Sequence, residues 1–248
     1  NPKSIVYLFS GGKDSALALS ITRDFVRNLC TEIKCKVYVV YIYVTGNTHP
    51  LNNACVHFIM QWHTRNYGFE PIYLASSKNF LEYLSRYGLE ILKGRWCYTE
   101  FKYKPLVDFE SMLPKPVVEI DGMSPSDSMI RREILKAEFH EVRSERRHYW
   151  AWHPLFSLNL PSRERLELLR QHEEFKCVTQ LYEIFEDSMN CVICPYKSKE
   201  KLMKLTAVEP SEIYYNALEV SLKSSRWKKK FRLLKSSESL EKYLVNTA

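Results

Sequence analysis

Short apolar runs alternate with segments of helical spacing along the amino-terminal part of the chain. Residues 5–9, 35–44 and 71–75 are rich in β-branched and aromatic side chains, and each run predicts a strand. Between them, residues 14–28 and 52–67 repeat apolar side chains at the spacing of an α-helix. Strand, helix, strand, helix and strand in this order predict a parallel sheet with right-handed crossovers.

The same pattern continues further along the chain. Residues 79–87 and 98–113 have helical spacing, whereas residues 116–120 and 149–153 predict two more strands. The run at 35–44 is almost wholly apolar, which is typical of a strand covered on both faces. We therefore expect an α/β fold in which a parallel five-stranded sheet is sandwiched by helices.

The chain changes character near Pro154, where strand patterns stop and charge-rich helical patterns begin. We predict an α/β domain over residues 1–154 and a helical carboxyl-terminal region over residues 155–248. No Gly/Ser-rich linker separates the two, so we expect them to pack together. The helices predicted in the second region cover residues 162–174, 197–206, 210–223 and 239–245.

The composition is that of an ordinary globular protein. Of the 248 residues, 45% are hydrophobic and 26% are charged, so a packed core is available and disorder is excluded as the main state. No apolar run approaches the roughly 18 residues that span a bilayer, and the amino terminus shows no signal-peptide pattern. We expect a cytoplasmic protein without a membrane segment. The formal net charge of +7 favours anionic partners such as nucleotides or nucleic acid.

The chain contains seven cysteines. Without an export signal, we interpret them as thiols or metal ligands rather than as a disulfide framework. Cys30, Cys35 and Cys55 have no ligand spacing among them, and we expect them to fill the core. Cys191 and Cys194 form a Cys-x-x-Cys-Pro sequence, in which two thiolates on one turn can reach the same metal atom or cluster.

The segment Ser10-Gly11-Gly12-Lys13-Asp14-Ser15 connects the first predicted strand to the first predicted helix, where open α/β sheets bind their ligands. Two glycines let the backbone approach a pyrophosphate, while two hydroxyls and the start of a helix add donors. Asp14 beside a phosphate requires a bridging cation, so we predict that it coordinates Mg²⁺ or water. A capped turn would account for one glycine and one cap, but not for the whole combination.

This hexapeptide resembles the PP-loop of the ATP pyrophosphatases, a superfamily that includes GMP synthetase, tRNA thiolation enzymes and sulfonucleotide reductases. The resemblance implies a Rossmann-like, HUP-type sheet that binds ATP. It also implies that an oxygen of the substrate is adenylated with release of pyrophosphate, after which a nucleophile displaces AMP.

Four further segments resemble the phosphoadenylyl-sulfate (PAPS) reductase family in consistent order: residues 94–106, 122–131, 153–155 and 190–196. The resemblance implies a nucleotide that is ATP or an adenylyl-sulfate nucleotide, a [4Fe–4S] cluster and catalytic residues Lys13, Asp14 and Lys102. The implied metal ligands are Cys97, Cys191 and Cys194, and the implied nucleotide-binding residues are Ser10, Gly11, Gly12, Lys13, Asp14, Ser15, Thr45, Gly46 and Arg131.

The chain departs from the reductase pattern in several places. Tyr98 stands where the reductases have a second adjacent cysteine, and Ser124 and Asp127 replace an Arg and a Glu. No cysteine follows Cys194, although the reductases attack the sulfonucleotide with a cysteine near the carboxyl terminus. Cys177 is available as a fourth metal ligand, but its position is equally compatible with a core residue. Four thiolates would also suit Zn²⁺.

Residues 223–235, from Lys223 to Lys235, interleave seven basic side chains with Trp227 and Phe231. This segment is either a solvated helix face or a contact for the phosphate backbone of a nucleic acid, with aromatic residues that stack. A second basic cluster has neighbouring glutamates as alternative partners and consists of Arg143, Arg146, Arg147 and His148.

Three functions remain open at this point. The first is a sulfur-transfer enzyme, for which the DNA phosphorothioation proteins of the same family are the nearest model. The second is a PAPS or adenylyl-sulfate reductase, and the third is a non-catalytic module that binds a nucleotide and a cluster. The hexapeptide, Lys102 and the cysteines favour an enzyme. The partners we expect are an adenine nucleotide, a nucleic acid acceptor, a sulfur- or electron-donor protein and a second copy in a homodimer.

Overall fold

The computed structural model describes residues 1–87, 96–186, 188–192 and 194. Its strands are β1 (Ser4–Leu8), β2 (Lys36–Tyr43), β3 (Glu70–Ala75), β4 (Val117–Ile120), β5 (Phe139–Arg143) and β6 (His148–Trp152). Its α-helices are α1 (Lys13–Ile33), α2 (Pro50–Tyr67), α3 (Phe80–Tyr87), α4 (Trp96–Tyr98), α5 (Lys104–Ser111), α6 (Met129–Ile134), α7 (Leu155–Leu158), α8 (Ser162–Leu169) and α9 (Lys176–Phe185). Three shorter helical turns are η1 (Thr99–Tyr103), η2 (Pro125–Asp127) and η3 (Glu173–Phe175).

The strands form one sheet in the order β3-β2-β1-β4-β6-β5. All neighbouring pairs are parallel except β5 and β6, which are antiparallel. The predicted α/β fold is confirmed, and the five predicted strands correspond to β1, β2, β3, β4 and β6. The expected number of strands was wrong, because β5 forms a sixth strand at one edge of the sheet. Its sequence mixes charged and apolar residues and its side chains are only partly buried, so it lacks a strong strand pattern.

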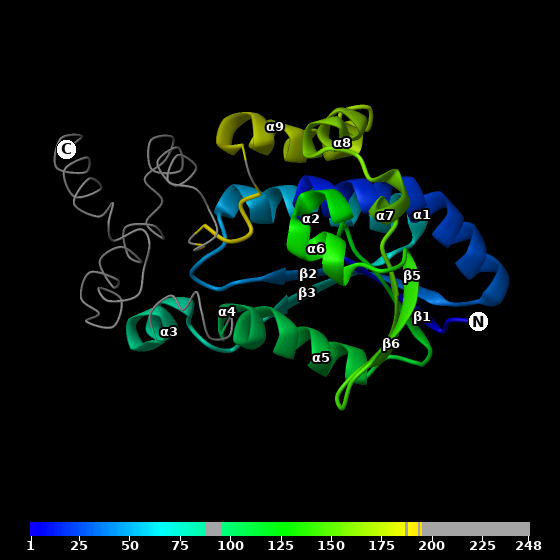
Figure 1. The fold of residues 1–248 in the computed structure, drawn as a ribbon, viewed down its shortest axis with the longest axis horizontal. Coiled ribbons are helices and arrows are strands. Elements are labelled where there is room, and N and C mark those ends of the chain that lie inside the picture. Colours follow the sequence, from blue (N-terminus) through cyan, green and yellow to red (C-terminus); the bar gives the residue numbers. More distant parts are fainter. Residues whose placement is uncertain (88–95, 187, 193, 195–248) are drawn as a thin grey trace.

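Helices cover both faces of the sheet. Figure 1 shows α1 and α2 on one face, with α8 and α9 beyond them, and α3 and α5 on the other. Side chains in β1 alternate between the two faces: Ile5 and Tyr7 belong to the core beneath α1 and α2, whereas Val6 packs with Leu106 and Phe109 of α5. Burial on both faces explains why this strand reads as a continuous apolar run.

The helices that follow Pro154 share the core of the α/β part. Leu169, Phe175 and Val178 are buried in the same cluster as Leu17 of α1 and Val56 of α2. The expected packing of the two regions is therefore present for α8 and α9, while a domain boundary near Pro154 stays a prediction. The helix expected over 162–174 is instead α8 followed by a turn and η3, and α9 was not expected at all.

Several predicted segments lie outside the described residues. These are the helices expected over 197–206, 210–223 and 239–245, and the basic segment 223–235. Within the part of the chain that the structure describes, no helix is both long enough and apolar enough to cross a membrane.

Candidate active site

The predicted phosphate loop joins the end of β1 to the first turn of α1, as expected for a ligand site at the carboxyl edge of a parallel sheet. Gly11 adopts a left-handed backbone conformation with φ of +77°. A Cβ atom there would lie 2.6 Å from both Asn52 Oδ1 and Val56 Cγ2 of α2. Only glycine combines this conformation with so close an approach of the loop to α2.

Two serines hold the loop in shape from inside. The Ser15 hydroxyl donates to the Gly12 carbonyl at 2.9 Å and accepts from the Ser10 amide at 3.1 Å. The Ser10 and Ser15 hydroxyl oxygens are 3.1 Å apart, and the Gly12 amide donates to Ser10 Oγ at 3.3 Å. From α2, Asn52 Nδ2 donates to the Ser10 carbonyl at 3.4 Å. These hydrogen bonds therefore fix the conformation of the loop without a ligand.

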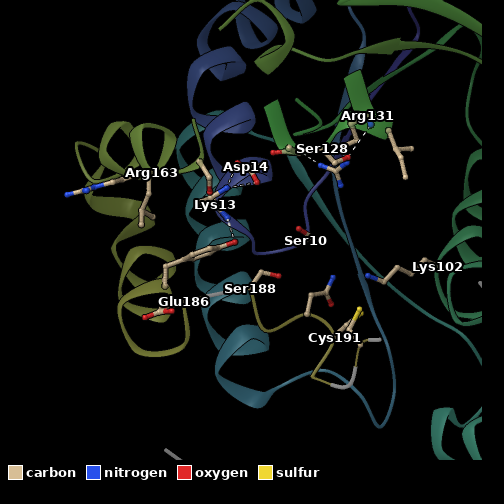
Figure 2. A pocket seen from close by; sticks show the side chains of 17 residues that line it. Ser10, Lys13, Asp14, Lys102, Ser128, Arg131, Arg163, Glu186, Ser188 and Cys191 are labelled. Atoms are coloured by element: carbon tan, nitrogen blue, oxygen red, sulfur yellow. Dashed lines mark hydrogen bonds and ion pairs between the residues drawn. The ribbon is translucent and has the colours of Figure 1, made fainter. Parts of the chain in front are cut away.

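A cavity of about 1060 Å³ opens beside this loop. Figure 2 shows Ser10, Lys13 and Asp14 in its wall, with Lys102 reaching toward it from η1 and Cys191 below. The structure thus brings together seven of the residues predicted for the site: Ser10, Lys13, Asp14, Lys102, Arg131, Cys191 and Cys194. A smaller cavity of about 320 Å³, which shares Ser10, Asp14 and Arg131 with the main one, is also lined by Gly12 and Ser15.

Thr45 and Gly46 do not line these cavities. They follow β2 in a turn in which Gly46 has φ of +83° and packs against Phe80 and Leu81 of α3. The Phe80 amide donates to the Thr45 carbonyl at 3.3 Å. Their predicted contact with the nucleotide therefore stays a prediction, and the geometry shown is that of a turn that begins α3.

An apolar pocket of about 160 Å³ adjoins the main cavity and shares Ser10 and Lys102 with it. Its walls are the ends of β1 and β2 and the rings of Tyr98 and Tyr103, whose centroids are 6.1 Å apart. Tyr98, which departs from the reductase pattern, is thus a wall of an apolar pocket next to the phosphate loop.

Charged side chains at the loop form a connected group. Lys13 Nζ lies 2.7 Å from both carboxylate oxygens of Asp14, and burial lowers the pKa of Lys13 although Asp14 opposes this shift. Arg165 Nη1 contacts Asp14 Oδ1 at 2.8 Å and Arg165 also pairs with Asp127, which in turn pairs with Arg131. Burial alone would raise the pKa of Asp127, but Arg165 and Arg131 together hold it below its usual value.

Three cysteines, Cys97, Cys191 and Cys194, lie outside the disulfides of the structure and are partly buried. The interaction with Cys191 raises the pKa of Lys102 above its ordinary value against the effect of burial, and Cys194 and Cys97 add to this effect. Burial, followed by the charges of Cys191 and Cys194, raises the pKa of Cys97. The three thiols are therefore close enough to influence one another and Lys102.

The chemistry of these thiols is that of ligands to an iron–sulfur cluster. Among the described residues, however, no group of three His, Cys, Asp or Glu side chains is already arranged to hold a metal ion. Cys97 and Cys191 are both partly buried and pack against a small core cluster that includes Phe80 and Phe101. The predicted metal ligation by these three residues stays a prediction.

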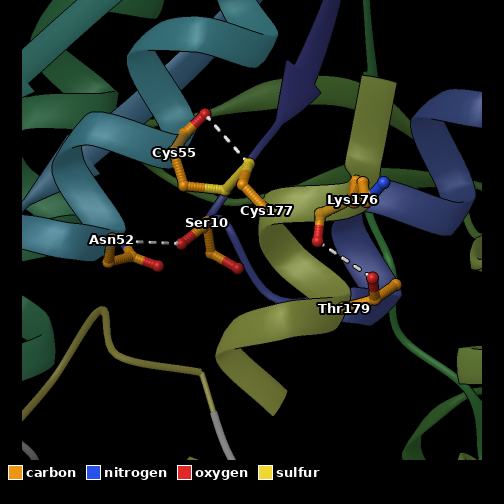
Figure 3. The surroundings of a disulfide bond; sticks show 6 residues. All are labelled: Ser10, Asn52, Cys55, Lys176, Cys177 and Thr179. Atoms are coloured by element: carbon orange, nitrogen blue, oxygen red, sulfur yellow. Dashed lines mark hydrogen bonds between the residues drawn. A yellow bond between two sulfur atoms is a disulfide. The ribbon is translucent and has the colours of Figure 1, made fainter. Parts of the chain in front are cut away.

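The prediction for Cys177 as a fourth ligand was wrong. Cys177 of α9 forms a disulfide with Cys55 of α2, and Figure 3 shows this bond close to Ser10 and Asn52. A second disulfide joins Cys30 and Cys35. Cys30 and Cys55 are buried in the core and Cys35 packs against it, as expected, but the expectation that these three residues are unpaired thiols was wrong. Sequence spacing could not reveal the first pairing, because the two cysteines are 122 residues apart and meet only when α9 packs on α2.

The structure also adds residues that the sequence did not indicate. The Lys13 amide donates to the Tyr182 hydroxyl at 3.4 Å, and Lys13 Nζ lies 5.8 Å from the centre of the Tyr182 ring. Arg165 and Tyr182 come from α8 and α9, where they stand among ordinary amphipathic helix residues. No motif in the sequence distinguishes them from surface positions.

The sequence matches no known protein-family model, and no curated protein sequence matches it either. The solved structures to which this chain is similar include the following two. The U34-tRNA thiolase NcsA from Methanococcus maripaludis, with its [4Fe-4S] cluster, is 16% identical and gives a TM-score of 0.44 over 90% of this chain and 72% of that one. The FMN adenylyltransferase of Candida glabrata, in complex with FMN and the ATP analogue AMPCPP, is 11% identical and gives a TM-score of 0.36 over 62% of this chain. This chain spans 42% of the length of the adenylyltransferase. At such low sequence identities and TM-scores, neither likeness shows what this chain binds or which reaction it catalyses.

Proposed function

We propose that this chain is an ATP-consuming enzyme of the PP-loop type that cleaves the nucleotide at the α-phosphate and acts in sulfur transfer. The observation that carries this proposal is the convergence of three kinds of group on one cavity. The phosphate loop supplies Ser10, Lys13 and Asp14, η1 supplies Lys102, and the carboxyl-terminal segment supplies Cys191 and Cys194. A simple strand-to-helix turn would not require the last three.

The loop would bind the phosphates through its amides, its serine hydroxyls and the start of α1. Lys13 would move from Asp14 to a phosphate oxygen, and Asp14 would then be available to hold Mg²⁺ between itself and the phosphates. The adjoining apolar pocket, with Tyr98 and Tyr103 in its wall, has the character of a site for the adenine base.

The reaction that follows from this arrangement has two displacements. An acceptor oxygen attacks the α-phosphorus, the bond to pyrophosphate breaks, and pyrophosphate leaves with the electron pair while the acceptor becomes adenylated. Sulfide then attacks the activated carbon and forms a carbon–sulfur bond, the carbon–oxygen bond breaks, and AMP leaves with the former acceptor oxygen and the electron pair. Lys102 and Arg131 would stabilise the negative charge that develops on the leaving groups.

Cys97, Cys191 and Cys194 would hold the [4Fe–4S] cluster of this proposal, with Zn²⁺ as the alternative. When bound, such a cluster leaves one iron without a protein thiolate, which is suited to carrying sulfide. Lys102, which lies among these thiolates, would balance part of their charge and connect them with the phosphate loop.

A nucleic acid is the acceptor class to try first. The main cavity is much larger than the apolar pocket beside it, and its lining includes cationic side chains from α1, η1, α6 and α8. The net charge of +7 agrees with an anionic macromolecule as partner. The basic segment 223–235 is the part of the chain that we expect to extend this contact.

The proposal is tested by measuring Mg²⁺-dependent release of pyrophosphate from ATP, with and without RNA or DNA as acceptor. Replacement of Asp14 by Ala should lower this rate by at least about a hundredfold, since a group that neutralises charge at the reacting phosphates is lost. Asp108→Ala on the exposed side of α5 is the matched control and should retain the wild-type rate. Full activity of Asp14→Ala would rule out the proposed phosphate site.

Metal content gives a second and independent test. Protein purified without oxygen should contain iron and acid-labile sulfide, and Cys191→Ser or Cys97→Ser should lose them, whereas Cys30→Ser should not. Zinc in place of iron would select the alternative metal. Release of sulfite from a sulfonucleotide with thioredoxin as the reductant would instead make the chain a PAPS or adenylyl-sulfate reductase.

A further inference from the structure

Arg165 is a buried cation of α8 that touches the phosphate loop from outside the cavity. Its side chain is 1% exposed and bridges two carboxylates, Asp14 at the start of α1 and Asp127 in η2. We propose, on the basis of the function proposed above, that Arg165 is a positioning residue that fixes the Asp14 carboxylate for binding of the magnesium–nucleotide complex.

The two cations on Asp14 have different surroundings. Lys13 Nζ contacts both Asp14 oxygens and lies in the cavity wall, so it can turn toward a phosphate without breaking an ion pair with any other residue of the described part of the chain. Arg165 Nη1 contacts Oδ1 at 2.8 Å, and Arg165 does not line the cavity. Once Lys13 has turned away, Arg165 still holds the Asp14 carboxylate at Oδ1.

Arg165 stays in place because its second anchor is itself fixed. Asp127 accepts from the Ser124 amide at 3.3 Å in a capping box and also pairs with Arg131. Moving Arg165 away would leave two partly buried carboxylates without their shared cation, which is costly in a protein interior. The Arg165 guanidinium thus joins η2 and α1, through a hydrogen bond from Nη2 to Asp127 and an ion pair between Nη1 and Asp14.

The loop after β4 also contacts Asp14, through its backbone. A Cβ atom on Gly122 would lie 2.4 Å from the backbone carbon of Asp14, so the glycine allows this loop to rest directly on the first turn of α1. The backbone of Asp14 is therefore confined by Gly122 and its carboxylate by Arg165. The Asp14 position depends on α8, a helix that contributes no residue to the phosphate loop itself.

Arg165→Lys separates this positioning role from a role in charge alone, because it keeps the cation and removes the guanidinium. The measurement is the affinity for α,β-methylene-ATP, with and without Mg²⁺, by calorimetry. We expect the enhancement of affinity by Mg²⁺ to fall at least about tenfold in Arg165→Lys, with metal-free affinity within about twofold of wild type. Arg170→Lys, at the end of the same helix and paired with Glu167 and Glu183, should match wild type in both measurements.

A double-mutant cycle shows whether the effect passes through Asp14. In protein that carries Asp14→Asn, the added Arg165→Lys should change the Mg²⁺ enhancement by less than about twofold. Electron paramagnetic resonance of Mn²⁺ with the same analogue should show a bound-metal signal that weakens in Arg165→Lys but not in Arg170→Lys. If Arg165→Lys does not fold, Asp127→Asn removes the second anchor instead and should give the same selective loss.

The possible results distinguish failure of the inference about Arg165 from failure of the proposed function. A wild-type enhancement by Mg²⁺ that Arg165→Lys retains overturns the inference about Arg165 and leaves the proposed function standing. An equal loss of enhancement in the presence and absence of Asp14 also overturns it. Wild-type protein that does not bind the analogue, or binds it without regard to Mg²⁺, contradicts the proposed function and the inference together.

Discussion

Two buried arginines, Arg165 and Arg147, each bridge two carboxylates from distant elements, yet their surroundings differ. Arg165 joins Asp14 and Asp127, and both of these carboxylates line the main cavity. The group around it, with Lys13 and Arg131, contains three cationic side chains and two carboxylates, an excess of one positive charge. Such a group attracts a phosphate.

Arg147, in the turn between β5 and β6, is enclosed by protein. Its guanidinium donates to Glu110 Oε2 of α5 at 2.9 and 2.7 Å and also pairs with Glu119 of β4. It stacks 4.3 Å from the centre of the Tyr149 ring. Here two carboxylates share one guanidinium, so the excess charge is negative, and none of these residues lines the cavities beside the phosphate loop.

The two groups show that a buried arginine that bridges two carboxylates can have two different roles. The Arg147 group holds the β5–β6 turn against α5 and β4. Its role is therefore to fix the position of that turn. The Arg165 group also joins distant elements, but it leaves carboxylate oxygens and cationic groups facing a space that a ligand can enter. Access to the cavity and the sign of the excess charge, rather than the presence of a buried arginine, distinguish the candidate site from a structural contact.

The largest effect that this comparison predicts is on stability at Arg147. Arg147→Met should lower the free energy of unfolding by about 3 to 5 kcal/mol, because Glu110 and Glu119 would remain buried without their cation. Chemical denaturation measures this loss. Where the variant is still folded, its affinity for α,β-methylene-ATP with Mg²⁺ should equal that of wild type.

Arg165→Met is the corresponding change at the other group. Its loss of stability should be smaller, because Asp14 keeps its contact with Lys13 and Asp127 keeps its contact with Arg131. Its effect on nucleotide affinity should be the larger of the two. If Arg147→Met reduced nucleotide affinity as much as Arg165→Met does, the distinction between the two groups would be lost.

The sequence predicted the position of the segment from Ser10 to Ser15 because all of its parts are contiguous, whereas its binding of phosphate stays a prediction. Ser10 to Ser15 follow a strand and begin a helix, so local pattern alone placed them at the edge of the sheet, and the structure confirms that position. Lys102, Arg131, Cys191 and Cys194 were found through family motifs, and the structure brings all four to the same cavity.

What the sequence missed depends on packing between distant segments. Arg165 and Tyr182 reach the loop only because α8 and α9 lie on α1 and α2, and no local pattern specifies that docking. The same holds for the disulfide between Cys55 and Cys177, which disproved the prediction of a fourth metal ligand. The strand β5 was missed because an edge strand carries charged side chains and has a weak apolar pattern.

Two glycines with similar backbone conformations differ in how closely neighbouring atoms surround them. Gly11 in the phosphate loop and Gly68 after α2 have similar backbone angles, with φ of +77° and +72°. A Cβ on Gly68 would meet nothing within 4 Å, so Gly68→Ala should cost about 1 kcal/mol for the left-handed backbone alone. Gly11→Ala should cost about 2 to 4 kcal/mol, because its Cβ would also press on Asn52 and Val56.

The two glycine variants should also differ in ligand binding. Gly11→Ala moves the loop that carries Ser10 and Gly12, so its affinity for the nucleotide analogue should fall at least about tenfold, whereas Gly68→Ala should bind as wild type does. Thermal or chemical unfolding, together with calorimetry, measures both effects. Equal stability losses in the two variants would mean that α2 yields to the loop and that the site is less crowded than its contacts indicate.

The smallest predicted effect is a difference in how the two groups respond to acid. The pKa of Asp127 is lowered, because Arg165 and Arg131 outweigh the effect of burial. Asp127 therefore stabilises the fold above its unfolded pKa of about 4, and this contribution is lost as the pH falls through its folded pKa. The pKa of Glu110 is raised by burial in spite of Arg147. Ionised Glu110 therefore opposes folding, and that cost is relieved as the pH falls through its raised pKa.

Unfolding free energies of wild type, Asp127→Asn and Glu110→Gln between about pH 7 and about pH 2 test these opposite signs, because the lowered pKa of Asp127 lies below about 4. The advantage of wild type over Asp127→Asn should shrink on acidification, by about 1 kcal/mol, since only wild type loses an ionised carboxylate that is paired in the fold. Against Glu110→Gln, wild type should instead gain by a similar amount, because only wild type can protonate a carboxylate that is buried beside Glu119. If the two differences in unfolding free energy changed in the same direction, the same balance of burial and charge would govern both carboxylates. The contrast between the Arg165 group and the Arg147 group would then rest only on access to the cavity.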